Sequence, residues 1–148
     1  MKTIKLFLIT SLFFTFGVQA QEYSSKNIPT VVHQEFAKHY PNMFAYEWEY
    51  KKKKGYFEAE FIDKGREMKA YFWPDGKWIQ TKTEIKKTEL SAEIWKSLSE
   101  TNYQNWKVDD VDLFETPTFS EVYRLELKNG KQKLYLYFLA NGKQVNLN

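Results

Sequence analysis

The sequence predicts an α+β fold in which two tandem helix-plus-four-strand repeats form one antiparallel sheet with both helices on one face. The first observation is an internal repeat, because residues 56–81 return as residues 122–147 after a constant shift and without a gap. The second is the alternation of apolar and polar residues inside both copies, which is the period of a half-buried strand. The third is a glycine turn at the same place in each copy, marked by Gly76 and Gly142.

Residues 1–20 have the features of a secretory signal peptide. Lys2 and Lys5 come first, an apolar centre follows, and the small residue Ala20 precedes the expected cleavage point. The apolar centre is too short to span a bilayer comfortably, and no stop-transfer pattern follows it, which argues against a retained membrane anchor. We therefore expect an exported protein without stable membrane insertion after cleavage, whose mature domain is residues 21–148.

The composition of the mature chain limits its partners. The full sequence has 22 Lys and Arg against 19 Asp and Glu, and the signal peptide removes Lys2 and Lys5, which leaves 20 against 19. A nearly neutral exported protein without a basic face is not expected to bind nucleic acid. The chain has no cysteine, so no disulfide can hold the fold, and burial of its many aromatic side chains must stabilise it instead.

The first predicted repeat covers about residues 28–86 and begins with a helix over residues 28–40. Val32, Phe36 and Tyr40 recur at four-residue spacing and give this helix one apolar stripe. Strands are expected over residues 43–53, 56–62, 69–73 and 78–85.

The first of these strands is rich in aromatic residues. Phe44, Tyr46, Trp48 and Tyr50 alternate with smaller or charged residues, so we expect the four rings on one half-buried face. Residues 73–76, with the sequence WPDG, predict the tight turn between the third and fourth strands.

The second repeat covers about residues 88–148 and follows the same plan. Ser91 can cap a helix that runs to about residue 103. Residues 106–114 predict the next strand, and the repeated segment supplies the others. Three acidic residues weaken the strand prediction over residues 106–114, namely Asp109, Asp110 and Asp112.

Each repeat has about 60 residues, and units this small are marginally stable alone because they bury too little apolar surface. We therefore expect the two repeats to share one hydrophobic core beneath the helices. The strand residues that the alternation directs toward the helices are Phe57, Ala59, Phe61, Met68, Ala70, Phe72, Tyr123, Leu125, Leu127, Leu134, Leu136 and Phe138.

The opposite face of the sheet is the candidate binding surface. If the chain has only two helices, no element remains to cover this face, and large rings among charges are typical of surfaces that bind a protein or peptide. In the alternative interpretation, the rings and the Lys and Arg stems only stabilise cross-strand pairs. The candidate binding residues are Tyr71, Trp73, Trp78, Tyr135, Tyr137, Glu58, Glu60 and Arg124, with Lys69, Lys82 and Glu126 on the same face.

Several short motifs resemble a known family of exported bacterial proteins. They are the IP before the first helix and the YP at its end, the YFEAEF strand, the WPDGKW hairpin and the ANGKQ of the second copy. Together they resemble the β-lactamase-inhibitor-like, PepSY-like family. The resemblance implies a curved sheet of two units, a periplasmic or secreted location in a Gram-negative bacterium, and a role in binding or restraining secreted hydrolases. This chain lacks the disulfides of the namesake inhibitor, so the resemblance does not carry β-lactamase over as the target.

The sequence offers no catalytic signature, and we expect no enzyme activity, no cofactor and no metal site. No GxSxG, Gly-rich phosphate loop or zinc-ligand spacing occurs, and His33 and His39 are wrongly spaced to share a metal on one helix face. Glu58 and Glu60 could form a carboxylate pair of the kind that cleaves glycosides, but acids at alternate positions of an exposed strand are usually solubilising.

The sequence thus favours a non-enzymatic periplasmic module that presents its aromatic sheet face to a protein or peptide. The alternative is an inhibitor of a secreted protease or other hydrolase. An inhibitor of this kind would insert a protruding loop, at residues 51–55 or 115–120, into the active site of its target.

Overall fold

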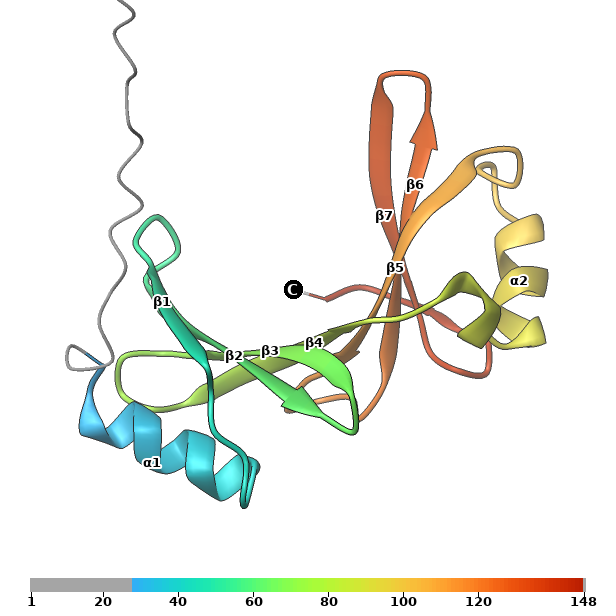
Figure 1. The fold of residues 1–148 in the computed structure, drawn as a ribbon. Helices are drawn as coiled ribbons and strands as arrows, with labels where there is room; N and C mark the ends of the chain where they lie inside the picture. The colour runs from blue at the N-terminus through green and yellow to red at the C-terminus, as the bar shows by residue number, and fades with distance from the viewer. Residues whose placement is uncertain (1–27, 148) are drawn as a thin grey trace, which may run out of the picture.

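The computed structural model describes residues 28–147, and the predicted signal peptide lies outside them (Figure 1). All eight strands form one sheet in chain order, and every neighbouring pair is antiparallel. The predicted α+β class is confirmed. The elements are α1 (Thr30–His39), β1 (Glu47–Lys51), β2 (Tyr56–Asp63), β3 (Arg66–Phe72), β4 (Trp78–Glu84), the 3-10 helix η2 (Lys87–Glu89), α2 (Ala92–Ser99), β5 (Lys107–Glu115), β6 (Val122–Asn129), β7 (Gln132–Phe138) and β8 (Gln144–Val145).

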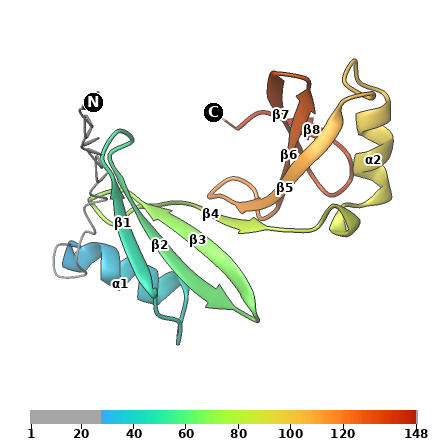
Figure 2. The same ribbon diagram turned by 45° about the horizontal axis from the view of Figure 1, so that its top comes forward.

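Both α-helices lie on one face of the sheet, at its two ends. One row of cross-strand partners on this face connects Phe61 of β2 with Phe138 of β7 through the four strands between them. Phe61 packs beneath α1 and Phe138 beneath α2, so the helices share a face, as predicted. The sheet bends between the repeats, which makes the helix face convex and the opposite face concave (Figures 1 and 2).

α1 packs its apolar stripe on the strands of the first repeat. Val32 and Phe36 are buried, and the ring centroid of Phe36 lies 5.2 Å from that of Phe61 and 5.5 Å from that of Trp48. These edge-to-face contacts add to the stability that apolar burial supplies. The helix ends at His39, close to the predicted end, because Pro41 disfavours the α conformation in the residue before it.

α2 occupies the equivalent place in the second repeat and is shorter than predicted. Ser91 caps it as expected, since its Oγ accepts a hydrogen bond from the Ile94 backbone N–H at 3.2 Å. Ile94 and Leu98 are buried against the sheet. The Thr101 hydroxyl donates to the Leu98 carbonyl at 2.8 Å and satisfies one of the terminal acceptors, so the chain leaves the helix there.

The apolar side chains form two clusters, one beneath each helix. Residues predicted to face the helices do so, but those from β2 and β3 pack with α1 and those from β6 and β7 pack with α2. The small polar residues Thr81 and Thr83 of β4 occupy the convex face between them. The bend carries the helices apart, so the predicted single core is wrong. The repeats share a sheet instead.

The turn before the last strand of each repeat docks on the helix of the same repeat. The Gly76 N–H donates to the Trp73 carbonyl, and the Gly142 N–H donates to the Leu139 carbonyl, both at 2.9 Å. Both glycines have positive φ, and a Cβ on Gly142 would lie 2.6 Å from the Glu93 carbonyl oxygen. The two copies therefore repeat a tertiary contact as well as a strand pattern.

The start of β1 departs from the predicted alternation. Trp48 is buried and Tyr50 partly buried, but Phe44 is 84% exposed and Tyr46 is 53% exposed. β1 begins only at Glu47, and Met43 and Ala45 pack against the α1 cluster in place of the two rings. The prediction that all four rings share a half-buried face is wrong for Phe44 and Tyr46.

Candidate binding face

The concave face of the sheet carries the candidate binding residues. Alternation along each strand places on it the residues that do not face the helices, and the cross-strand register aligns them into rows. We use the term concave face for this surface, which includes Glu47, Glu49, Lys51, Tyr56, Glu58, Glu60, Glu67, Lys69, Tyr71, Trp73, Lys82, Asp110, Asp112, Phe114, Arg124, Glu126, Lys128, Lys133, Tyr135 and Tyr137.

Trp78 is the one predicted binding residue that does not lie on the concave face. The β3–β4 register shifts by one residue between Tyr71 and Phe72, so Trp78 pairs with Phe72 on the convex side. Its indole N–H donates to the Thr81 Oγ1 at 3.1 Å, and its ring lies 5.0 Å from that of His39. The placement predicted for Trp78 is therefore wrong, because a bulge reverses the alternation.

An aromatic cluster occupies the concave face of the first repeat. The Tyr56 ring lies 5.3 Å from that of Tyr71 and 6.2 Å from that of Trp73. Burial, and the Glu58 carboxylate beside it, raise the pKa of the Tyr71 hydroxyl far above its ordinary value. Tyr71 is only 8% exposed, whereas Trp73 is 40% exposed. Tyr71 therefore supports the cluster, and Trp73 is its accessible member.

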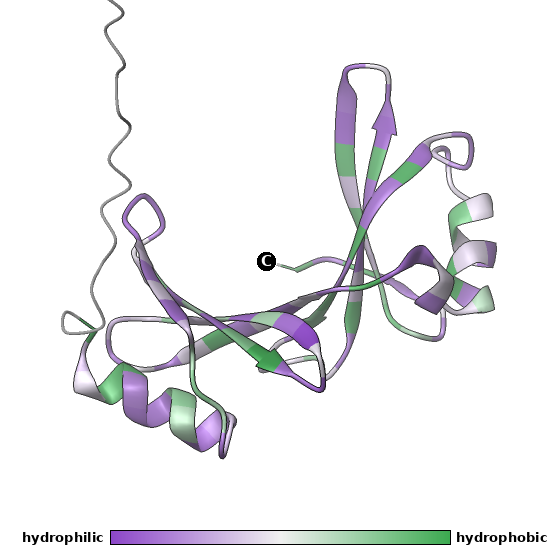
Figure 3. Ribbon diagram, viewed as in Figure 1, coloured by the Kyte–Doolittle hydropathy of each residue, from purple (hydrophilic) through white to green (hydrophobic). Residues whose placement is uncertain are grey.

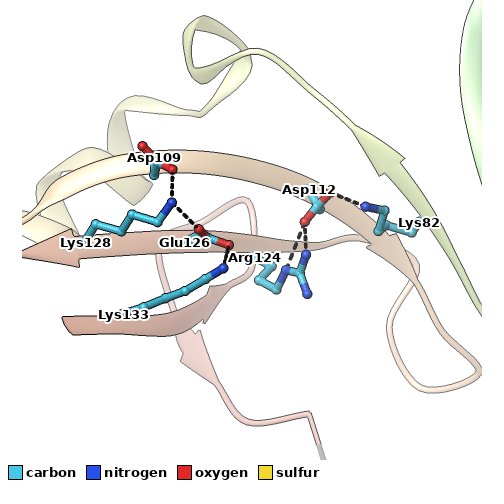
Figure 4. A network of polar contacts seen from close by, with 7 residues as sticks. All are labelled: Lys82, Asp109, Asp112, Arg124, Glu126, Lys128 and Lys133. Atoms are coloured by element: carbon cyan, nitrogen blue, oxygen red, sulfur yellow. Dashed lines mark hydrogen bonds and ion pairs between the residues drawn. The ribbon is translucent and has the colours of Figure 1, made fainter. Parts of the chain in front are cut away.

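Arg124 organises the second repeat's part of the concave face. Its Nε donates to the Asp112 Oδ2 at 2.9 Å (Figure 4). Its guanidinium carbon lies 5.1 Å from the Phe114 ring centroid and 4.8 Å from that of Tyr135. Lys82 Nζ lies 3.1 Å from the other Asp112 oxygen. Asp112 is buried between these two cations, so the guanidinium plane is fixed beneath the 40% exposed Tyr135 ring.

A second charge network lies beside Arg124, toward the β6–β7 turn. Glu126 accepts from Lys133 at 2.7 Å and lies 3.2 Å from Lys128, which also contacts Asp109 at 2.5 Å (Figure 4). Hydrogen bonds from Lys107 and Lys128 lower the pKa of Asp109 to about 2. At neutral pH all of these groups are charged and paired.

The two glutamates of β2 are paired with lysines. Glu58 lies 3.0 Å from Lys51 and Glu60 contacts Lys69. Burial favours a higher pKa for Glu60, but the hydrogen bond and charge of Lys69 outweigh burial and lower it. A general acid in glycoside cleavage needs a raised pKa, whereas the pKa of Glu60 is lowered.

An exposed apolar group at the open end of β1 and β2 did not enter the predicted site. Phe44, Tyr46 and Ile62 are 84%, 53% and 58% exposed, and the Tyr46 hydroxyl lies 3.4 Å from Glu60. Continuous alternation assigned Phe44 and Tyr46 to the buried face. Phe44 and Tyr46 are exposed because β1 begins only at Glu47. The sequence carries no clear signal of this late start.

The rings lie on an open surface rather than in a pocket. A hollow of about 680 Å³ near the β2–β3 turn is lined by charged residues such as Arg66 and Glu89, and no aromatic side chain borders it. Within residues 28–147, no group of three acidic, His or Cys side chains is placed to hold a metal ion. None of the helices in this range is both long and apolar enough to cross a bilayer.

A family model described as "Putative beta-lactamase-inhibitor-like, PepSY-like" matches residues 17–60 and 55–145. The chain belongs to this family. The sequence resemblance is thereby confirmed over most of the chain. A search of curated proteins found no match.

Solved structures of Bacteroides proteins are similar to the chain. A "BLIP-like protein" of Bacteroides fragilis is 30% identical, with a TM-score of 0.68 over 80% of this chain and 83% of that one. A DUF2874 family protein of Bacteroides ovatus is 24% identical, with a TM-score of 0.68 over 80% and 84%. A "putative periplasmic" protein of Bacteroides eggerthii is 20% identical, with a TM-score of 0.65 over 80% and 86%. The last two likenesses establish the fold alone.

Proposed function

We propose that the protein is a non-enzymatic periplasmic binding module whose concave face binds a protein or peptide. One observation carries the proposal: both helices lie on the convex face, and the concave face they leave uncovered exposes Trp73 and Tyr135 among charged residues. Tyr and Trp supply large contact area at low entropic cost, and Arg joins them in the energetically dominant part of interfaces.

The ion pairs prepare this face for binding. Asp112 holds Arg124 and Lys82, and Glu126 holds Lys128 and Lys133, so these long side chains are already restrained before a partner arrives. Restraint of this kind lowers the entropy lost on association. The concave curvature also suits a convex partner surface.

The predicted signal peptide supports a periplasmic location, as does the relative described as "putative periplasmic". A location in the periplasm limits the partner to secreted or envelope proteins and their peptides.

The test replaces Trp73 and Tyr135 with alanine and compares the double variant with Trp95→Ala. Trp95 is 39% exposed on α2, so it is matched in exposure to Trp73 but lies on the convex side. A partner isolated from periplasmic extract with the unmodified protein is purified, and its affinity for each variant is measured by calorimetry. We expect the double variant to lose about a hundredfold in affinity, which two interface aromatics commonly supply, and Trp95→Ala to bind normally. Equal binding by both variants would contradict the proposal.

An inhibitor of a secreted hydrolase is the second candidate, and the "BLIP-like" relative favours it. The β1–β2 hairpin tip is exposed and hydrophilic, with Lys52, Lys53 and Lys54 in solvent (Figure 3). An inhibitor that acts through this loop would lose its effect when the three lysines become alanine, whereas the Trp73 and Tyr135 changes would matter less. The same affinity measurement separates the two modes.

A further inference from the structure

The second repeat leaves part of a strand edge open where the first repeat has a strand. In the first repeat, β4 pairs with β3 from Met68 to Phe72. The equivalent residues of β7 are 134–138, but β8 pairs only with Tyr137 and Phe138. Within the described part of the chain, residues 134–136 therefore have a neighbouring strand on the β6 side only.

The hydrogen bonds identify the backbone groups that point out of this edge. The Leu139 N–H donates to the Lys143 carbonyl at 2.9 Å, so residue 139 faces the β8 side. Backbone groups alternate along a strand, so those of Tyr137, Tyr135 and Lys133 face the same way. The first repeat has the same arrangement, because the Trp73 N–H donates to the Lys77 carbonyl. There the counterpart of Tyr135 is Lys69, and β4 pairs with it through Lys82.

No described element covers the edge at Tyr135. After Val145 the chain turns away from β7, and Asn146 and Leu147 border a hollow with Ile79 and Phe119 instead. Tyr135 is 40% exposed and Lys133 is exposed beside it. The β6–β7 hairpin extends beyond the end of β5, and β7 lies on the side of β6 that is away from β5 (Figure 1). The N–H and C=O of Tyr135 are therefore available to another strand.

We propose that the edge of β7 at residues 133–136 binds an extended segment of a partner protein as an added antiparallel strand. The segment would take the place that β4 fills in the first repeat. The inference rests on the proposed function, because it specifies how the partner engages beside the concave face. Strand addition supplies affinity through backbone hydrogen bonds and selectivity through alternate side chains.

The first repeat indicates the side chains that such a segment carries. Thr81 and Thr83 of β4 point toward the helix side and are buried, so the segment needs small or β-branched residues there. On the concave side, Lys133 stands where the first repeat has Glu67, so an acidic residue is favoured opposite it. A second copy of β7 is a poor occupant, because it brings its own exposed lysines, Lys131 and Lys133, to the same edge.

The test uses a synthetic acetylated and amidated peptide with the sequence of residues 81–86, TKTEIK, which copies the end of β4 and places a glutamate opposite Lys133 without reaching the position that β8 occupies at Tyr137. Titration into the nitrogen-labelled protein is followed by NMR. In the free protein the amides of Lys133 and Tyr135 should exchange rapidly, and we expect the peptide to shift their signals and slow their exchange. Tyr135→Pro removes the outward N–H without touching the β6 pairing, whereas Tyr135→Ala removes only the side chain. The Pro variant should bind about tenfold more weakly than the Ala variant.

Three results would overturn the proposal. The first is equal binding of the peptide by the Pro and Ala variants. The second is that the peptide slows hydrogen exchange only at amides of β1. The third is a slowly exchanging Tyr135 amide in the free protein, which would mean that residues after Val145 already pair there. Thermal unfolding of Tyr135→Pro checks that this variant folds. This experiment needs no natural partner. If the edge binds no peptide while the double Trp73 and Tyr135 variant still loses its partner, strand addition fails and the concave-face function stands.

Discussion

Asp112 is a buried carboxylate on the concave face of the sheet. It is 1% exposed, and its two oxygens are shared between Lys82 and Arg124. Burying one charge costs several kcal/mol unless opposite charges and hydrogen bonds compensate, and two cations supply this compensation. Asp112 therefore fixes the position of Arg124 beneath Tyr135.

Asp112→Asn is expected to destabilise the protein by about 2 kcal/mol, because it leaves two cations without their shared counter-charge. The expected loss is below that for a fully buried pair, since the Lys82 and Arg124 side chains are 23% and 22% exposed and water relieves part of the cost. Urea unfolding monitored by circular dichroism measures the change.

Asp110→Asn is the matched control for this change. Asp110 lies on the same strand, is only partly buried, and has no ion pair within the described residues. Its replacement should change stability by less than about 0.5 kcal/mol. Similar losses of unfolding free energy in both variants would mean that stability depends on the acidic character of β5 and not on the ion pairs of Asp112.

At the scale of the element, the docked turns connect each hairpin with its helix. Gly142→Ala should destabilise by about 3 kcal/mol, because it combines a positive φ of 81° with a Cβ 2.6 Å from the backbone of α2. Gly130→Ala should cost only about 1 kcal/mol, since Gly130 has a positive φ but no atom within 4 Å of a Cβ. Thermal unfolding of both variants measures the difference, and equal costs would show that the turn can lift from the helix.

The elements show what sequence could and could not predict. Alternation and the repeat identified every strand and the faces of β2, β3, β6 and β7, because residues buried on one side cannot change face without losing their burial. Alternation failed where a single residue changes the register, as at Trp78, and where a strand starts late, as at Tyr46. Such local shifts depend on tertiary contacts that periodicity does not contain.

The candidate site shows the same limit. The sequence located seven of its eight proposed residues on the concave face, since their positions follow from alternation. In the sequence, Asp112 only weakened the strand prediction for residues 106–114. Its role depends on Lys82 and Arg124, which only strand pairing brings beside it.

At the scale of the whole molecule, two apolar clusters are joined by one sheet. The junction is the β4–β5 pairing, from Thr81 opposite Glu115 to Glu84 opposite Asp112. Units of about 60 residues are marginal alone. We therefore expect each cluster to depend on the other through this junction, which lies where the sheet bends between the repeats (Figures 1 and 2).

Phe61→Ala tests this dependence. Phe61 is fully buried beneath α1, so its truncation should cost about 3 kcal/mol. If the repeats unfold together, amides of β6 in the second repeat should lose as much hydrogen-exchange protection as those of β2, although β6 lies in the other cluster. Leu127→Ala, in the α2 cluster, is the reciprocal variant and should lower protection in β2. Protection of β6 that is unchanged by Phe61→Ala would mean that the repeats are separate folding units, and the concave face could then change its curvature when a partner binds.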